Sequence, residues 1–233
     1  MLISTPGLVL HTTPYAETSV VVKVFTRLMG VRAYIIKGVR GRGGRVKQNM
    51  LQPLTSLDMV VYDNPHSTLN YVKELTPRHP YLQPDPVTGA LRFFMTEVLY
   101  KSLHDAEPMP DLWDFAEQAA SGQWAASCGQ QPVLFMLAVA RHLGIEPLDN
   151  HMSHEPYFDL GEGRFVAAPT ETTLAPALSL LLHQYLATPD ADMPMPPLRE
   201  RTALLNALIA YYQLHLSAFN NFTSHEILHT ILR

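Results

Sequence analysis

Cysteine is nearly absent from this chain of 233 residues, which contains only Cys128. A single thiol excludes an internal disulfide framework and any metal site built from cysteines alone. The chain also lacks a run of 18 apolar residues, and its start, Met1–Pro6, has neither the basic residues nor the long apolar stretch of a signal peptide. We therefore expect a protein of the cytoplasm that does not enter a membrane.

Acidic residues are missing from one long segment, with none between Thr18 and Leu57. The net charge of −4 conceals this asymmetry: residues 1–80 carry ten Lys and Arg against four Asp and Glu, and residues 81–233 carry seven against seventeen. Five cations fall within residues 37–47. Phosphate backbones favour such clusters because each neutralised phosphate releases a counterion. The first part is thus expected to face nucleic acid, although a solvated basic loop is the simpler alternative.

The first 80 residues show the twofold alternation and β-branched composition of strands. Expected strands are Leu8–His11, Ser19–Thr26, Val31–Ile36, Leu51–Tyr62 and Thr68–Leu75, with Val20, Val22 and Val24 facing inward. Five strands without an intervening long helix favour a small closed barrel. The proline-rich segment Thr76–Pro86 ends this pattern.

Beyond that segment the period changes to that of helices. Helices are expected from about Leu91 to Leu103 and over Asp111–Ala120, Pro132–Leu143, Leu174–Leu186 and Leu198–Ala218, with a short one from Ser224. Tyr157–Val166 is the exception and predicts two short β segments around Gly161 and Gly163. The expected fold is an α+β protein of two domains: a five-stranded OB-fold β-barrel over residues 1–78 and an all-α domain over 80–233. A linker is expected at Thr188–Pro197.

Four short motifs occur in order within the barrel region. They are Tyr15-Ala-Glu-Thr-Ser19, Val24-Phe-Thr26 followed by Gly30, Lys37-Gly-Val-Arg40 and Leu51-Gln-Pro-Leu54. Together they resemble the N-terminal signature of the RecO family, most strongly over residues 8–75. The resemblance implies an OB-fold and a helical domain in a non-enzymatic, nucleoid-associated protein, and for this chain we expect no cofactor. It implies binding of single- and double-stranded DNA, strand annealing and recombinase loading in recombinational repair. RecR, sometimes RecF, and the acidic C-terminal tail of single-strand-binding protein are the implied partners.

The candidate DNA-binding residues follow from this signature and the charge pattern. Cations at the K-G-x-R motif, after it and in the preceding strands are expected to contact phosphate: Arg27, Arg32, Lys37, Arg40, Arg42, Arg45 and Lys47. Aromatic rings can add base stacking. Of Tyr15, Phe25, Tyr34, Tyr62 and Tyr71, most are expected in the core, with Tyr15 and Tyr34 the best stacking candidates.

The chain departs from the family pattern at a metal site. Many relatives carry paired Cys-x-x-Cys motifs that form a four-ligand zinc site, whereas here His151 and His154 stand at the first pair and no second pair follows. Asp159 or Glu171 could complete a site, but two histidines seldom hold zinc. We expect no metal, and a Phe158–Phe165 hairpin in its place.

His225-Glu-Ile-Leu-His229 matches the H-E-x-x-H pattern of zinc peptidases, and His215 could supply an upstream third ligand. Thr223 to Glu226 also forms a capping box, which explains the glutamate without catalysis. A zinc-dependent metallopeptidase is therefore one alternative function, and an RNA-binding or regulatory module on the same barrel is another.

The acidic second half offers weaker candidates for a partner site. Cations beside apolar helix residues could receive the tail of single-strand-binding protein: Arg141, His142, Arg199 and Arg201. No motif supports these residues, and a charged face that keeps the domain in solution is the simpler interpretation.

Overall fold

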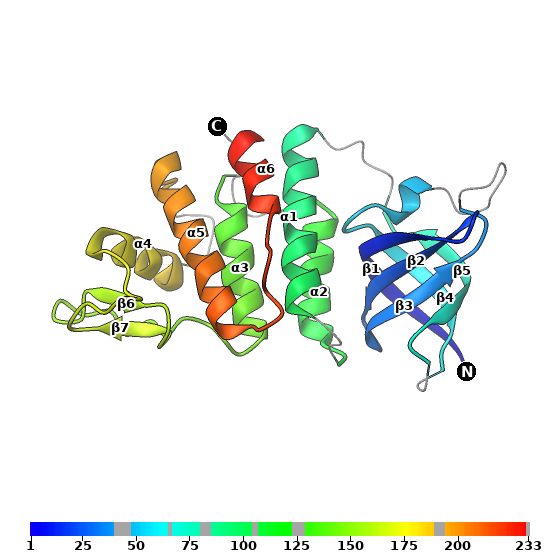
Figure 1. Cartoon of the computed structure of the whole chain (residues 1–233), viewed down its shortest axis with the longest axis horizontal. Helices are drawn as coiled ribbons and strands as arrows, with labels where there is room; N and C mark the ends of the chain where they lie inside the picture. Colours follow the sequence, from blue (N-terminus) through cyan, green and yellow to red (C-terminus); the bar gives the residue numbers. More distant parts are fainter. Residues whose placement is uncertain are drawn as a thin grey trace. The chain divides into compact units, whose positions relative to one another are not determined.

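The computed structural model describes residues 1–39, 48–64, 67–79, 85–103, 107–122, 129–188 and 194–231 (Figure 1). The chain forms two compact units. The first unit comprises Met1–Asp85 and Met95–Gln123, and the second comprises Pro86–Phe94 and Trp124–Arg233. Residues Met95–Gln123, which were expected in the helical domain, belong to the same compact unit as the strands. The expected boundary between the two domains, at residues 78–80, stays a prediction. Part of the expected linker, residues 189–193, lies outside the described residues.

A closed barrel forms the larger part of the first unit. Its strands are β1 (Leu2–Tyr15), β2 (Ser19–Thr26), β3 (Gly30–Ile36), β4 (Ser56–Tyr62) and β5 (Asn70–Pro77). They close in the order β1-β2-β3-β5-β4, with β1 paired to β4; the β3–β5 contact is parallel and the others are antiparallel. This confirms the expected five-stranded OB-fold.

The alternation predicted for β2 is confirmed. Val20, Val22 and Val24 are buried inside the barrel with Tyr34 of β3 and Met59 of β4. Residues of opposite parity face outward, because successive side chains of a strand point to opposite sides. At the β2–β3 turn the Thr26 hydroxyl donates to the Gly30 carbonyl and accepts from the Met29 N–H.

The expected strand Leu51–Tyr62 is wrong in its first part. Residues Gln48–Leu51 form a short 3-10 helix, η1, and Leu54 has a φ of 58°, so that β4 begins only at Ser56. Pro53 lacks the N–H that a ladder needs. The turn instead buries Leu51 and Leu54 at the barrel, where the Leu54 N–H donates to the Val9 carbonyl at 2.8 Å. Tertiary burial of two leucines thus overrides the apolar pattern.

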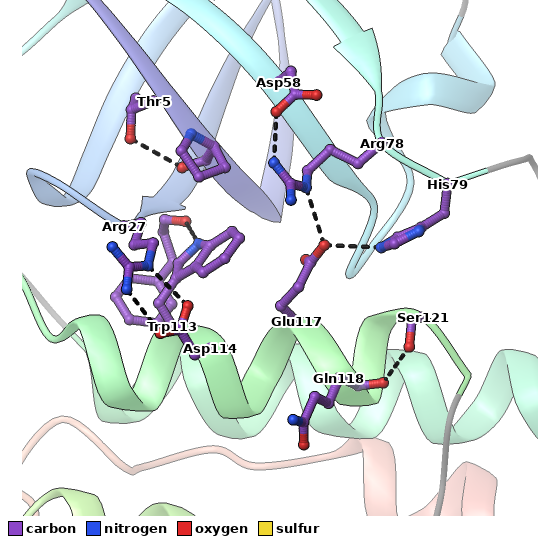
Figure 2. A network of polar contacts seen from close by, with 12 residues as sticks. Thr5, Arg27, Asp58, Arg78, His79, Trp113, Asp114, Glu117, Gln118 and Ser121 are labelled. Atoms are coloured by element: carbon purple, nitrogen blue, oxygen red, sulfur yellow. Dashed lines mark hydrogen bonds and ion pairs between the residues drawn. The ribbon is translucent and has the colours of Figure 1, made fainter.

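Helices complete the first unit on the outside of the barrel. The second half of α1 (Pro86–Ser102) and all of α2 (Pro110–Ala120) belong to it. Leu8 of β1 lies opposite Phe25 of β2, and both side chains point away from the barrel interior. Both are nevertheless fully buried. The indole Nε1 of Trp113 on α2 donates to the Phe25 carbonyl at 2.9 Å (Figure 2). This outer wall is therefore covered by protein.

The second unit is helical apart from one hairpin. It contains α3 (Gln131–His142), α4 (Pro176–Ala187), α5 (Leu198–His215) and α6 (Ser224–Ile231), with β6 (Tyr157–Asp159) paired to β7 (Arg164–Val166). The helices and both β segments agree with the expectation. Within the described ranges, none of the helices has the length and apolar character needed to cross a membrane.

Two buried tyrosines, one in each unit, lead to opposite predictions. Among the described residues the Tyr34 hydroxyl has no hydrogen-bond partner, whereas the Tyr212 hydroxyl donates to the Met136 carbonyl. Since an unsatisfied buried hydroxyl costs more than it contributes, Tyr34→Phe should raise the free energy of unfolding by about 1 kcal/mol, and Tyr212→Phe should lower it by about as much. Urea unfolding measures both. Destabilisation by both changes would show that Tyr34 has a partner, such as an internal water.

Candidate nucleic-acid interface

Residues 37–47, which carry five cations and are called the basic segment here, lie between parts of the chain that belong to the barrel. Arg40, Arg42, Arg45 and Lys47 lie outside the described residues, but the flanking Val39 and Leu51 are buried in the barrel core. Lys37 follows β3 directly and is exposed, and its ammonium lies 5.3 Å from the centre of the Tyr71 ring. The segment therefore begins and ends at the barrel surface, with Lys37 as its first cation.

Arg27 is engaged inside the unit. Its Nε and Nη2 donate to the two carboxylate oxygens of Asp114 on α2 at 2.8 and 2.9 Å (Figure 2). The hydrogen bond from Arg27 and its charge lower the pKa of Asp114 below the ordinary value, and the same pair raises the pKa of Arg27. The guanidinium expected on phosphate is thus already neutralised by a carboxylate.

The other barrel cations divide into paired and unpaired groups. Arg78 binds Asp58 and Glu117, and Lys73 lies 3.4 Å from Glu74. Arg32 is half-buried and donates to the Val31 carbonyl. In the described part of the chain, no carboxylate lies within ion-pair distance of Arg32 or Lys37, so these two fit phosphate contacts best.

The expected stacking residues are only partly where the sequence placed them. Tyr15 is 49% exposed at the end of the β1–β2 hairpin, as expected. Tyr34 is fully buried, and burial, followed by the charge of Asp63, raises the pKa of its hydroxyl. Its proposed stacking role is wrong because its position in β3 points inward, with Val22 opposite.

Two tyrosines expected in the core are exposed instead. Tyr62 on β4 and Tyr71 on β5 are 52% and 47% exposed. They border a groove of about 680 Å³ together with Ile35, Ile36, Lys37, Val72, Lys73, Glu74, Leu75 and Thr76. Sequence reasoning missed this groove. The alternation of Tyr71, Val72 and Lys73 was the available signal, because it places the tyrosine and the lysine on the same face.

A second recess lies at the other end of the basic segment. It has a volume of about 630 Å³ and is bordered by Val39 and Leu51, by Thr12, Pro14, Val20 and Pro53, and by the amides of Gln48, Asn49 and Gln52. Amide side chains can donate to phosphate oxygens, and they can both donate to and accept from sugars and base edges. Described residues on both sides of positions 40–47 thus border recesses.

The residues at the family's zinc position do not fit a four-ligand site. His151 stacks on His183 with ring centres 4.6 Å apart, and His183 Nδ1 lies 2.6 Å from Asp149 Oδ1. His154 is exposed, and no cluster of three metal-ligating side chains occurs within the described ranges. The metal-free state itself stays a prediction.

Asp159, one suggested ligand, is committed to the hairpin. Burial alone would raise its pKa, but hydrogen bonds from the Thr170 hydroxyl, the Glu162 N–H, the Thr172 hydroxyl and the Gly161 N–H lower that pKa below its ordinary value. Phe158 and Phe165 are fully buried, with ring centres 5.1 Å apart in an edge-to-face arrangement. The Phe158–Phe165 hairpin therefore has an apolar core, and the carboxylate of Asp159 is hydrogen-bonded within the protein.

The H-E-x-x-H residues lie on α6. His225 and His229 are half-buried with their rings in edge contact, and Glu226 is exposed. The Glu226 N–H donates to the Thr223 carbonyl at 3.1 Å, in the first turn of the helix. His215, the suggested third ligand, instead bonds the Leu160 carbonyl through Nε2 at 2.9 Å. This arrangement gives no support to a zinc peptidase.

The candidate partner-binding residues of the second unit differ in their exposure and in their bonding partners. Arg141 pairs with Glu146, and Arg201 donates to the carbonyls of Gly129 and Pro196. Arg199 is exposed at the start of α5, and His142 is half-buried at the end of α3. Arg201 therefore has a local structural role, and the partner site stays a prediction.

The engaged state of Arg27 can be tested against that of Lys37. Arg27→Ala should change single-stranded DNA affinity less than Lys37→Ala, because Asp114 already neutralises Arg27. Asp114→Asn should release Arg27 and strengthen binding, most visibly at low salt. Fluorescence anisotropy with a labelled oligonucleotide measures all three. A larger loss for Arg27→Ala than for Lys37→Ala would show that the pair opens when DNA binds.

The same ion pair predicts a pH dependence of stability. Because Asp114 has a lowered pKa in the folded protein, its contribution is present above its unfolded pKa and is lost as pH falls through the folded value. Urea unfolding of wild type and Asp114→Asn should therefore converge in acid. A difference that persists after the carboxylate is protonated would contradict this origin.

Comparison with known proteins agrees with this geometry. Residues 1–81 match the family model described as recombination protein O N terminal. Over 240 residues the chain is 28% identical to a DNA repair protein RecO of Christiangramia forsetii, covering 99% of each chain, and to one of Phocaeicola vulgatus, covering 98% of each. A RecO of Porphyromonas gingivalis is 28% identical over 243 residues, with 99% of each chain covered. With an OB barrel at its N-terminus and relatives that match it along its whole length, the chain is similar to DNA repair proteins named RecO throughout.

Proposed function

We propose that this protein acts in DNA repair by binding single- and double-stranded DNA and annealing complementary strands. The full-length similarity to proteins named DNA repair protein RecO supports the repair role. The single observation that carries the binding proposal is the exposed Lys37 without a carboxylate partner in the described chain, at the start of the acid-free basic segment. A cationic segment rooted on a closed barrel can follow a phosphate backbone without reading sequence.

Annealing follows from the same electrostatics. Two complementary strands repel each other through their phosphates, and bound cations reduce that repulsion while leaving base edges available for pairing. The process needs no nucleotide hydrolysis, and the sequence has no Gly-rich loop ending in Gly-Lys-Ser or Gly-Lys-Thr. We therefore assign the protein the role of a non-enzymatic mediator that helps recombinase load onto single strands.

The partners belong to the proposal as well. RecR, possibly RecF, and the acidic tail of single-strand-binding protein are expected to contact this protein. For the acidic tail, Arg199 is the best placed of the candidate cations, because it is exposed at the start of α5. An RNA-binding module remains the alternative function, and preference for structured RNA over single-stranded DNA would favour it.

Changing Lys37, Arg40, Arg42 and Arg45 together to alanine tests the function directly. DNA affinity and annealing rate should both fall. The slope of log affinity against log salt should decrease by about 0.7 for each single-strand phosphate that the variant no longer neutralises. Anisotropy across a salt series and annealing of labelled complementary strands measure the two effects.

Changing Arg199, Arg141 and His142 in the second unit provides a control of three cationic or titratable residues. Arg201 is kept because it donates to the Gly129 and Pro196 carbonyls. This control should retain DNA binding. If the wild type binds no DNA at moderate salt, or if the control loses as much affinity as the barrel variant, the assignment of DNA binding to the barrel fails.

A further inference from the structure

An apolar row crosses the outside of the barrel perpendicular to its strands. Leu2 lies opposite Tyr62, Tyr62 opposite Tyr71, and Tyr71 opposite Ile35. Residues opposite each other on neighbouring strands point to the same side of a sheet. Four strands therefore contribute one side chain each to a continuous row, here called the tyrosine row.

The tyrosine row is open to solvent over most of its length. Leu2, Tyr62 and Tyr71 are 50%, 52% and 47% exposed, respectively. The side chain of Ile35 points to the outside of the barrel, since its neighbours Tyr34 and Ile36 face the core. It is only 6% exposed and lines the groove. Two aromatic side chains that remain half-exposed on adjacent strands are unusual for a structural surface, because packing would normally cover them.

Cations accompany the rings. The Lys37 ammonium lies 5.3 Å from the Tyr71 ring centre, and Lys73 borders the same groove. Lys73 pairs with Glu74 at 3.4 Å, but both side chains are exposed, at 45% and 67%. Such surface pairs contribute little stability, so a phosphate can replace the carboxylate as partner of Lys73.

We propose that the tyrosine row is a base-stacking platform for single-stranded nucleic acid, with Lys37 and Lys73 neutralising the adjoining phosphates. This inference rests on the proposed function and adds a site to it. Aromatic faces bind bases of any sequence, and only unpaired strands present their base faces. Lys37 borders the groove and is also the first of the five cations at residues 37–47, so the tyrosine row and the basic segment are adjacent in the chain.

The strand class follows from this geometry. The basic segment contacts phosphates, which single and double strands share, whereas the tyrosine row requires exposed bases. The row therefore increases affinity for single strands alone. An acidic peptide could use the same cations, but it has no need of two neighbouring rings and is treated as the competing occupant.

The test compares two double variants that differ only in ring character. Tyr62→Leu with Tyr71→Leu retains apolar bulk but removes the aromatic faces, and it should weaken binding of oligo(dT) at least about tenfold. Tyr62→Phe with Tyr71→Phe keeps the faces and should bind within about threefold of wild type, because stacking needs no hydroxyl. Duplex affinity should stay within about twofold of wild type for both variants, which also reports that they are folded.

A direct contact is tested by photo-crosslinking. Oligo(dT) with one 5-iodouracil should crosslink wild type at Tyr62 or Tyr71, as mapped by mass spectrometry of the peptides. Tyr15, which has the same exposure, serves as the internal comparison. Crosslinks at Tyr15 and none in the tyrosine row would overturn the proposal.

The outcomes separate this inference from the proposed function. If wild type binds neither oligo(dT) nor duplex, the proposed function fails. Suppose that wild type and the leucine variant bind oligo(dT) equally well, whereas a variant with Arg40, Arg42 and Arg45 changed to alanine binds it more weakly. The proposed function then stands and the stacking platform is wrong. Equal loss of single- and double-strand binding by the leucine variant also overturns it. The proposal is also overturned if the leucine variant loses binding to an acidic peptide while its binding to oligo(dT) is unchanged.

Discussion

The barrel closes between β3 and β5 through only two parallel residue pairs, Tyr34 with Asn70 and Ile35 with Tyr71. This short pairing determines the surface that surrounds it. After Ile36 the chain continues into the basic segment, residues 37–47, while β5 continues to Pro77 and forms one side of the groove. The exposed aromatic rings, the groove and the start of the cationic segment therefore meet where the sheet is least completely hydrogen-bonded.

The charge asymmetry of the sequence is partly cancelled inside the first unit. Part of the negative charge in the second half neutralises the barrel itself, since Asp114 and Glu117 on α2 bind Arg27 and Arg78 (Figure 2). These ion pairs attach α2 to the wall that also buries Phe25. The positive charge available to a ligand is thus smaller than the residue count suggests, and it is concentrated around Lys37 and the segment that follows it.

The hairpin of the second unit is held together by local packing and hydrogen bonds. The rings of Phe158 and Phe165 form its core, and Asp159 accepts hydrogen bonds from backbone and threonine donors. A carboxylate satisfied in this way has little capacity left for a cation. His151 lies beside this hairpin, with its ring in edge-to-face contact with Phe165.

Much of the fold could be predicted from the sequence because its signals are local. Alternation along Ser19–Thr26 placed three valines in the core, helical periodicity located α3 and α5, and four ordered motifs indicated the family. The site was less predictable. Tyr34 is buried and Tyr71 exposed although both lie in strands, because barrel closure decides which face becomes the interior. Arg27 meets a carboxylate 87 residues away, a pairing that no local pattern encodes. The sequence by itself determined the elements, the resemblance to RecO proteins and the sign of the surface charge. Tertiary structure alone decided which rings and cations remain accessible, since accessibility depends on long-range pairing.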